Sequence, residues 1–315
     1  PHPRERPTVD DEREHVLFYL TEVLWPVVPD VGEALDRAAA TVFGQAASEI
    51  GISGDEFPGG GGAEGSDPGS AGLVSPVRFA SWVGGDMDGN PNVTARTIRD
   101  TLERHRELAL RRHRTDLLEL SSFLSQSPRR VDVDPEVRER VQAYAALLPR
   151  TLEEIPARRR DLPYRILLRL MGARLGVALE DGEGGYAAAD ELSDDLRLVA
   201  RSLERHGGRH AGLRGVRRVL SRVEVFGFHL AALDTRQDAL LHRRVVGGLL
   251  DEEGWMETPA RDRSARLRQA LESPVPPAGS AEAEDEEARR TLEVFRALDE
   301  GRRRHGPGAV GPFIV

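Results

Sequence analysis

One acidic, glycine-rich turn holds side chains that could do chemistry. Residues 82–92 read WVGGDMDGNPN and place Asp86, Asp88 and Asn90 at alternating positions. Side chains spaced in this way bind a metal ion, orient an arginine, or cap the start of a helix. A calcium loop of the EF-hand type is excluded, because its sixth position requires glycine and its twelfth glutamate, where this sequence has proline and threonine. The other interpretations stay open, including a purely structural turn.

A second candidate is an arginine that follows an apolar run. Residues 226–237 read FGFHLAALDTRQ, so Arg236 lies two positions after Asp234 and directly before Gln237. The planar fork of a guanidinium forms two parallel hydrogen bonds to the oxygens of a phosphate or carboxylate. A structural ion pair between Asp234 and Arg236 is the simpler interpretation. His229 alternates with apolar neighbours, a pattern more typical of a hydrogen-bonded core histidine than of a catalytic base.

Composition excludes several kinds of chemistry. The 315 residues include no cysteine, and all 44 basic residues are arginine. Disulfides, zinc–thiolate sites, cysteine nucleophiles and catalytic lysines are therefore excluded in this segment. The net charge of −9 argues against general binding to nucleic acid or to anionic membranes. Because no apolar run approaches the roughly 20 residues that span a bilayer, we expect a cytoplasmic protein.

Helices dominate the elements that must position these side chains. Thr8 and Asp11 form a capping-box pattern, and Thr94 is placed to cap a long helix. Apolar spacing predicts helices over residues 9–25, 31–49, 95–124, 134–147, 150–160, 163–179, 189–206, 211–223, 238–251, 261–272 and 288–304. Short apolar runs predict strands over residues 77–83 and 225–233 and from residue 313 onward.

Two of these strand candidates lead through the polar clusters into helices. In a parallel α/β barrel, functional groups lie just past the carboxyl ends of the strands, which is where Asp86, Asp88 and Arg236 stand. The pattern predicts a mainly α fold with a few parallel barrel strands. A stretch rich in Gly, Ser and Pro, residues 51–75, is expected to be a flexible insertion, and the acidic residues 274–287 a solvated linker.

The two clusters together resemble the phosphoenolpyruvate carboxylase family. Residues 79–94, FASWVGGDMDGNPNVT, are similar to the family's F-G-S-W-x-G-G-D-R-D-G-N-P-x-V-T. Residues 226–237 are similar to its F-G-x-x-L-x-x-L-D-I-R-Q, and Pro163, Tyr164 and Arg165 to its E-P-Y-R at the start of a helix. The order and spacing of these motifs fit over essentially the whole chain.

This resemblance implies an internal segment, residues 1–315, of one large catalytic domain, with a partial TIM-type α/β barrel surrounded by many helices. Family members join bicarbonate to phosphoenolpyruvate with Mg2+ or Mn2+, giving oxaloacetate and phosphate, and the resemblance implies a homotetramer. The family's T-A-H-P-T-E motif is expected upstream of this segment. Its glycine- and arginine-rich loop, second histidine and metal-binding acids are expected downstream. We therefore expect no metal ligand here and no activity from this segment alone.

The resemblance also implies roles for individual residues. Arg236 stands at the family's L-D-x-R-Q arginine and is the candidate phosphate contact, and Asp234 is expected to orient it. Both are therefore candidate catalytic residues. Asp86 and Asp88 are expected to shape the neighbouring loop, with Trp82 packed beneath it. The candidate substrate-binding residues are Arg236, Gln237, Trp82, Asp86, Asp88 and Asn90.

Two positions depart from the family motifs. Met87 replaces an arginine, so an anion contact by that side chain is not carried over, and Thr235 replaces an apolar residue. Two other functions stay open. One is a catalytically inactive helical scaffold or interaction module derived from the same fold, and the other is an unrelated anion-binding regulator. Flanking histidine and glycine-rich motifs would favour the enzyme, whereas ligand affinity in the isolated chain would favour the regulator.

Overall fold

The chain divides into two compact units that are both built mostly from helices. The computed structural model describes residues 7–43, 77–88, 90, 92–127, 131–156, 160–273 and 286–315. Unit 1 comprises residues 1–16, 80–104 and 231–315, and unit 2 comprises residues 17–79 and 105–230. The predicted insertion, 51–75, lies outside the described residues.

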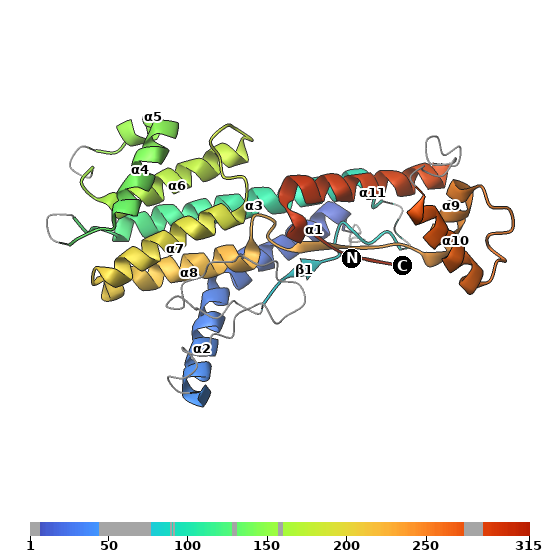
Figure 1. Ribbon diagram of the computed structural model, residues 1–315, viewed down its shortest axis with the longest axis horizontal. Coiled ribbons are helices and arrows are strands. Elements are labelled where there is room, and N and C mark those ends of the chain that lie inside the picture. The colour runs from blue at the N-terminus through green and yellow to red at the C-terminus, as the bar shows by residue number, and fades with distance from the viewer. Residues whose placement is uncertain are drawn as a thin grey trace, which may run out of the picture. The chain divides into compact units, whose positions relative to one another are not determined.

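The elements follow one another as Figure 1 labels them. The α-helices are α1 (Val9–Phe18), α2 (Trp25–Phe43), α3 (Ala95–Phe123), α4 (Pro135–Leu147), α5 (Pro149–Glu153), α6 (Pro163–Leu179), α7 (Ala189–Arg205), α8 (Leu213–Phe226), α9 (Ala239–Leu250), α10 (Ala260–Glu272) and α11 (Glu286–His305). A π-helical segment spans Tyr19–Leu24, and short 3-10 turns span Gly208–His210 and Pro307–Ala309. The strands are β1 (Ala80–Ser81), β2 (Ala232–Arg236) and β3 (Val310–Ile314).

Unit 1 contains a three-stranded parallel sheet with β2 between β1 and β3. Successive residues of a strand face opposite sides. Leu233 and Thr235, on one side of β2, are fully buried. The apolar core on that side is made by residues of α3, β2, α11 and the turn before β3, namely Ala95, Ile98, Leu102, Leu233, Val294, Ala297, Leu298 and Ala309. The predicted mainly α class and its parallel strands are confirmed, whereas closure into a barrel stays a prediction.

Within the described residues, β1 lies inside the strand predicted over 77–83, and β3 begins three residues before the predicted third strand. The second strand prediction was displaced. The run predicted as a strand over 225–233 begins as the last turn of α8, which ends at Gly227 with a φ of 51°. Leu230 also has a positive φ, of 61°, and β2 starts only at Ala232. A buried apolar run does not by itself distinguish a strand from a helix end and a turn. Arg236 is therefore the last residue of a strand instead of lying after it.

The first two predicted helices form one continuous helical stretch over residues 9–43. Pro29 lies in the gap between the two predicted helices, and a proline has no N–H to give to the carbonyl four residues earlier. That carbonyl belongs to Trp25, and Arg222 Nε donates to it over 3.0 Å. An arginine of α8 thus replaces the missing backbone donor, and the helix continues through Pro29.

The remaining helix predictions agree with the structure to within three residues, except for one helix that is shorter than predicted. The helix predicted over 150–160 ends at Glu153, since Ile155 precedes a proline and is disfavoured in helical conformation. The predicted linker ends before Glu286, which begins α11, and residues 274–285 lie outside the described residues. Within the described residues, no helix combines the length and the apolar character that crossing a bilayer requires.

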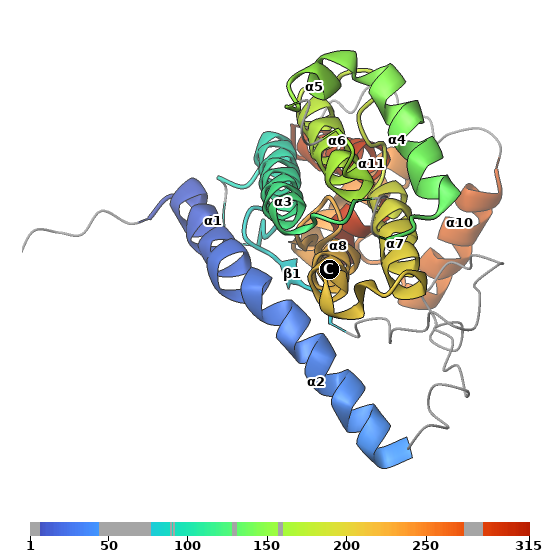
Figure 2. The ribbon, with the colours of Figure 1, turned by 90° about the vertical axis from the view of Figure 1, so that its left-hand side faces the viewer.

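Unit 2 is a helical assembly around one large apolar core. Helix α7 packs along α8, and α4 packs on α6. Figure 2 shows α6, α7 and α8 nearly end-on, with α7 beside α8. The core includes fully buried leucines from α3, α6 and α7, namely Leu110, Leu117, Leu167, Leu168, Leu170, Leu175, Leu192 and Leu196. Small residues permit close approach at these contacts, as where Gly172 of α6 meets Leu118 of α3.

A buried carboxylate in this core is paired with an arginine and accepts hydrogen bonds from two tyrosine hydroxyls. Asp195 of α7 is fully buried and forms an ion pair with Arg140 of α4. Its Oδ2 accepts hydrogen bonds from the hydroxyls of Tyr144, at 2.7 Å, and Tyr186, at 2.6 Å. The guanidinium of Arg174 lies 3.9 Å above the Tyr186 ring. Because each group is satisfied by another, the network stabilises the packing of α4, α6 and α7 despite its burial.

A histidine is buried in neutral form in the same unit. His113 of α3 is fully buried, and its Nε2 lies 2.7 Å from the carbonyl oxygen of Gly227, which ends α8. Burial lowers the pKa of His113 to about 4, because the charged ring would lose its hydration. Burial likewise lowers the pKa of His229 to about 4, as expected for a core histidine instead of a catalytic base.

We predict that Asp195→Ala lowers the free energy of unfolding by about 3 kcal/mol, since it removes a buried charge and leaves Arg140 and two tyrosine hydroxyls without their acceptor. Urea denaturation followed by circular dichroism measures the change. The matched control is Asp194→Ala on the same helix, because Asp194 is exposed and pairs only with Arg197. Equal effects from the two variants would contradict a structural role for the buried network.

We also predict that stability falls as the pH is lowered from 7 towards 4. In this range an unfolded chain protonates His113 near its ordinary pKa of about 6.5, whereas the folded chain does not until about pH 4. Proton binding therefore favours the unfolded state. The variant His113→Gln keeps a donor for the Gly227 carbonyl but cannot titrate. Its stability should fall less between pH 7 and pH 5, and an unchanged pH profile would show that His113 does not contribute.

Candidate functional site

The loop after β1 returns to the sheet because two glycines allow it. Gly84 has a φ of 91°, a conformation that side chains rarely adopt. A Cβ on Gly84 would lie 2.3 Å from the Thr101 hydroxyl of α3, and a Cβ on Gly85 would lie 2.2 Å from the Asp234 carbonyl oxygen of β2. Only glycine lets the loop approach both the helix and the strand this closely.

Two backbone hydrogen bonds join this loop to the end of β2. The Arg236 N–H donates to the Gly85 carbonyl over 3.0 Å, and the Met87 N–H donates to the Arg236 carbonyl over 2.8 Å. Asp86 thereby forms a parallel bridge with Arg236. The two clusters, about 150 positions apart in the sequence, are neighbours at the carboxyl end of the sheet. The structure therefore brings the backbones of Asp86 and Arg236 together.

The charged side chains of the two clusters meet as well. Arg236 Nη2 lies 2.5 Å from Asp88 Oδ2. The Arg236 side chain is 54% exposed and the Asp88 side chain 40%. Water screens an ion pair this exposed, so its contribution to stability is small. Because about half of the Arg236 side-chain surface is accessible, an anion in solution can reach this residue.

The other polar residues of the turn hold its own backbone. Asp86 Oδ1 accepts from the Asp88 N–H over 3.1 Å, and Asn90 Oδ1 accepts from the Asn92 N–H over 3.1 Å. These are the turn-forming bonds typical of Asp and Asn. Asp88 orients the arginine, whereas Asp86 and Asn90 shape the loop. Two of the interpretations offered by the sequence, an acid that orients an arginine and a structural turn, therefore apply to different residues of this cluster.

Three expected site residues are placed differently from the prediction. Asp88, not Asp234, is the acid that pairs with Arg236, while Oδ1 of Asp234 is buried without a hydrogen-bond partner among the described residues. Burial raises the pKa of Asp234. Trp82 is 67% exposed, so it does not pack beneath the loop. Gln237 is buried, and its amide lies 3.4 Å from the Thr291 hydroxyl of α11.

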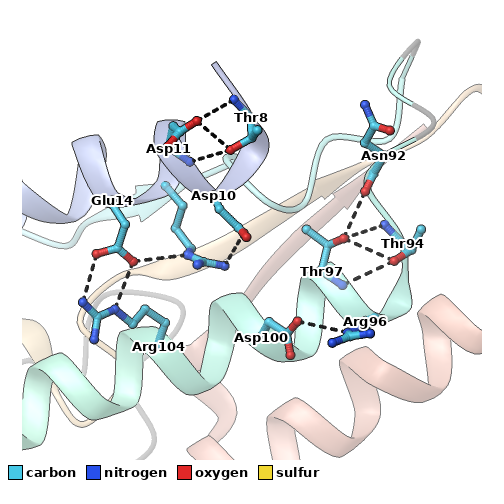
Figure 3. A network of polar contacts seen from close by, with 11 residues as sticks. Thr8, Asp10, Asp11, Glu14, Asn92, Thr94, Arg96, Thr97, Asp100 and Arg104 are labelled. Carbon is cyan, nitrogen blue, oxygen red and sulfur yellow. Dashed lines mark hydrogen bonds and ion pairs between the residues drawn. The ribbon is translucent and has the colours of Figure 1, made fainter. Parts of the chain in front are cut away.

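The start of α3 is fixed by reciprocal caps that Figure 3 shows. The Thr94 N–H donates to the Thr97 hydroxyl over 3.1 Å, and the same hydroxyl donates to the Asn92 carbonyl over 3.1 Å. Both oxygens of Glu14 on α1 accept from Arg104 of α3, at 3.0 and 2.9 Å. The predicted caps at Thr94 and at Thr8 with Asp11 are confirmed, and α3 is held where Thr101 can support Gly84.

One positioning residue of the second cluster escaped the sequence analysis. Asp238 caps the start of α9, its Oδ1 accepting from the Leu240 N–H over 2.6 Å. The cap turns the chain from β2 into a helix two residues after Arg236. An aspartate directly before a helical run is the signal that could have identified it.

No metal-binding group is assembled by these residues. Within the described part of the chain, no three His, Asp or Glu side chains gather closely enough to hold an ion. The acids of the loop are instead engaged by backbone N–H groups and by Arg236. The arrangement is that of an exposed arginine, held by one carboxylate at the ends of parallel strands, which is suited to binding an anion.

Comparison with known proteins identifies the family of the chain. A model of the phosphoenolpyruvate carboxylase family matches residues 3–315. The chain is 42% identical over 312 residues to a phosphoenolpyruvate carboxylase of Xanthomonas euvesicatoria, an alignment covering 98% of this chain and 31% of that protein. It is 36% identical over 267 residues to one of Mycobacterium avium, covering 79% of this chain and 27% of that protein.

The chain therefore belongs to the phosphoenolpyruvate carboxylase family. It spans about a third of the length of curated relatives from Xanthomonas species. Both sequence motifs lie inside the matched range.

We predict that Gly85→Ala destabilises unit 1 by about 2 kcal/mol, because the added Cβ would collide with the β2 backbone. Thermal or urea denaturation measures the change. Gly248→Ala is the matched control: this glycine lies inside α9 with no atom within 4 Å of its would-be Cβ, so alanine should stabilise the protein by about 0.5 kcal/mol. If Gly85→Ala left the free energy of unfolding unchanged, the close contact between the loop and β2 would be contradicted.

Proposed function

We propose that this chain supplies a substrate anion-binding arginine to the carboxylation of phosphoenolpyruvate by bicarbonate, which yields oxaloacetate and phosphate. The observation that carries the proposal is the exposed ion pair of Arg236 with Asp88 at the carboxyl ends of two adjacent parallel strands. Membership of the family supports the reaction, and the positions of both motifs support the site.

Arg236 is the residue to which we assign the phosphate contact. The reaction moves negative charge between the phosphate and the enolate oxygen, and a fixed guanidinium stabilises such charge without reorganising. Asp88 holds Nη2, so the other N–H groups are available to a second acceptor. Backbone bonds on both sides of Arg236 fix its Cα, and the ion pair with Asp88 orients the guanidinium.

Other parts of the enzyme are assigned by family membership. We propose that the three strands belong to a TIM-type barrel and that residues 1–315 form an internal part of its catalytic domain. In the family, Mg2+ or Mn2+ supplies a Lewis acid for the developing charge. The acids described here do not form its ligand set, so we expect the ligands elsewhere in the polypeptide. A homotetramer is proposed on the same ground.

We predict that Arg236→Ala lowers kcat/KM for phosphoenolpyruvate by about 100-fold to 1,000-fold, the effect of losing one preorganised charged donor. Steady-state kinetics should be measured on a polypeptide of family length that contains this segment. Arg236→Lys retains the charge but not the fork, so its activity should lie between those of the alanine variant and the unchanged protein.

The matched control is Arg303→Ala, since Arg303 is an exposed arginine of α11 paired with Asp299 one turn earlier. Its kinetics should equal those of the unchanged protein. Circular dichroism establishes that each variant folds. Near-normal kcat/KM in a folded Arg236→Ala variant would remove Arg236 from the site, as would an equal loss in the Arg303 control.

A further inference from the structure

The helix formed by the π-helical segment and α2 in unit 2 is apolar on two faces. On one face Trp25 stacks on Phe226 of α8, and Gly32 lies against Ser221 of the same helix. On a second face every fourth residue is apolar and between 39% and 49% exposed, namely Tyr19, Val23, Val27, Val31 and Leu35. Residues four apart are neighbours on a helix surface, so these five form one apolar stripe. A surface helix normally has one apolar face, so a second one indicates a second packing partner.

The apolar stripe is presented by a helix that is fixed in place. Arg222 compensates for the missing N–H of Pro29, so the helix continues without a break. Both oxygens of Glu33 accept from Arg214 of α8, at 3.0 and 2.8 Å, and tie α2 to that helix. In Figures 1 and 2 the second half of α2 extends away from the other labelled helices of unit 2. A face held in this way needs little reorganisation when a partner packs on it.

The size of the apolar stripe favours a partner within the same polypeptide. A stable contact between two separate proteins buries about 800 Å² on each partner and involves roughly 20–30 residues a side. Five side chains on one helix provide much less. Because two separate molecules also lose translational and rotational freedom when they associate, so small a contact does not hold them together. A segment of the same polypeptide is already close by, and a small contact is then sufficient.

The family provides the additional polypeptide that this argument requires. The alignment with the Xanthomonas euvesicatoria carboxylase covers 98% of this chain and 31% of that protein. Most of the relative therefore lies outside the part that residues 1–315 match. The apolar stripe itself is inside the matched range.

We propose that the apolar stripe is the docking face for an amphipathic helix of the same polypeptide that lies outside residues 1–315. The sixteen positions from Tyr19 to Leu35 span roughly 24 Å, so the docking helix has about four turns and runs along α2. Its own apolar residues recur at three- and four-residue spacing. The proposal rests on family membership and on unit 2, and it does not depend on Arg236 or on the carboxylation reaction.

Cysteine labelling of a polypeptide of family length tests whether the apolar stripe is covered. Residues 1–315 contain no cysteine, so peptide mass spectrometry reads a cysteine introduced among them without interference from that segment. Val27→Cys should react with a maleimide about tenfold or more slowly than Leu147→Cys, each rate being divided by that of the same variant in urea. Leu147 is the matched control, because it is an exposed apolar residue of α4, in the same unit, away from the stripe.

Photo-crosslinking identifies what covers the stripe. Val27→p-benzoylphenylalanine in the same polypeptide should give a product that runs at the mass of one chain on a denaturing gel. Its cross-linked peptide should come from outside residues 1–315, and the protection of Val27→Cys should not change on dilution. Circular dichroism establishes that each variant folds.

Three results would overturn the proposal. The first is labelling of Val27→Cys as fast as that of Leu147→Cys, which would leave the stripe uncovered. The second is a cross-linked product at twice the mass of the chain, or protection that is lost on dilution, since either result would make a second copy the partner. The third is a cross-linked peptide from within residues 1–315.

Discussion

The close approach of Gly85 to the β2 backbone is the contact on which the strand-end site depends. A methyl group at this position would lie 2.2 Å from a carbonyl oxygen, so the loop reaches the strand only without a side chain there. Once it does, the backbone of Gly85 and Met87 pairs with Arg236, and Asp88 arrives beside the guanidinium. The charged pair is weak in itself because it is exposed, whereas the backbone contact that presents it is tightly constrained. Gly85 thus determines how closely the loop approaches β2, and the Arg236–Asp88 pair determines which ligands suit the site.

The polar residues around Arg236 differ in their burial and in their hydrogen-bond partners. The side chains of Asp86 and Asn90 accept hydrogen bonds from the backbone of the turn. Asp88 forms a solvent-exposed ion pair with the arginine, whereas Asp234 lies on the strand with a raised pKa. A solvent-exposed counter-ion suits the anion-binding role that we propose for Arg236, because exchanging one oxygen partner for another costs less there than in a dry interior. The fully buried Asp195 of unit 2 illustrates the opposite arrangement, with two hydroxyls and an arginine in a permanent structural network.

The sequence predicted most helices because their apolar faces repeat with a helical period over many residues, and it predicted the caps at Thr8 and Thr94 from short-range side-chain chemistry. It also identified Arg236 and the acidic turn, since both sit in motifs with few alternatives. It did not predict the helix through Pro29, because the compensating donor, Arg222, lies almost 200 positions away. For the same reason it chose Asp234 over Asp88 as the partner of Arg236: proximity in sequence was visible, whereas proximity across strands was not. The strand start at Ala232 was missed because burial alone does not separate a helix end from a strand.

Residue-resolved hydrogen exchange of the Met87 and Arg236 amides tests the central claim most directly. Each donates to a backbone carbonyl across the contact between loop and strand, whereas the Asp88 amide donates only to the side chain of Asp86 within an exposed turn. The Met87 and Arg236 amides should therefore exchange much more slowly than the Asp88 amide, and at rates similar to each other, because one opening of the loop releases both. If the Met87 amide exchanged as fast as that of an unstructured peptide while Arg236 stayed protected, the loop would not be paired with β2. The account of how Asp88 reaches Arg236 would then be wrong.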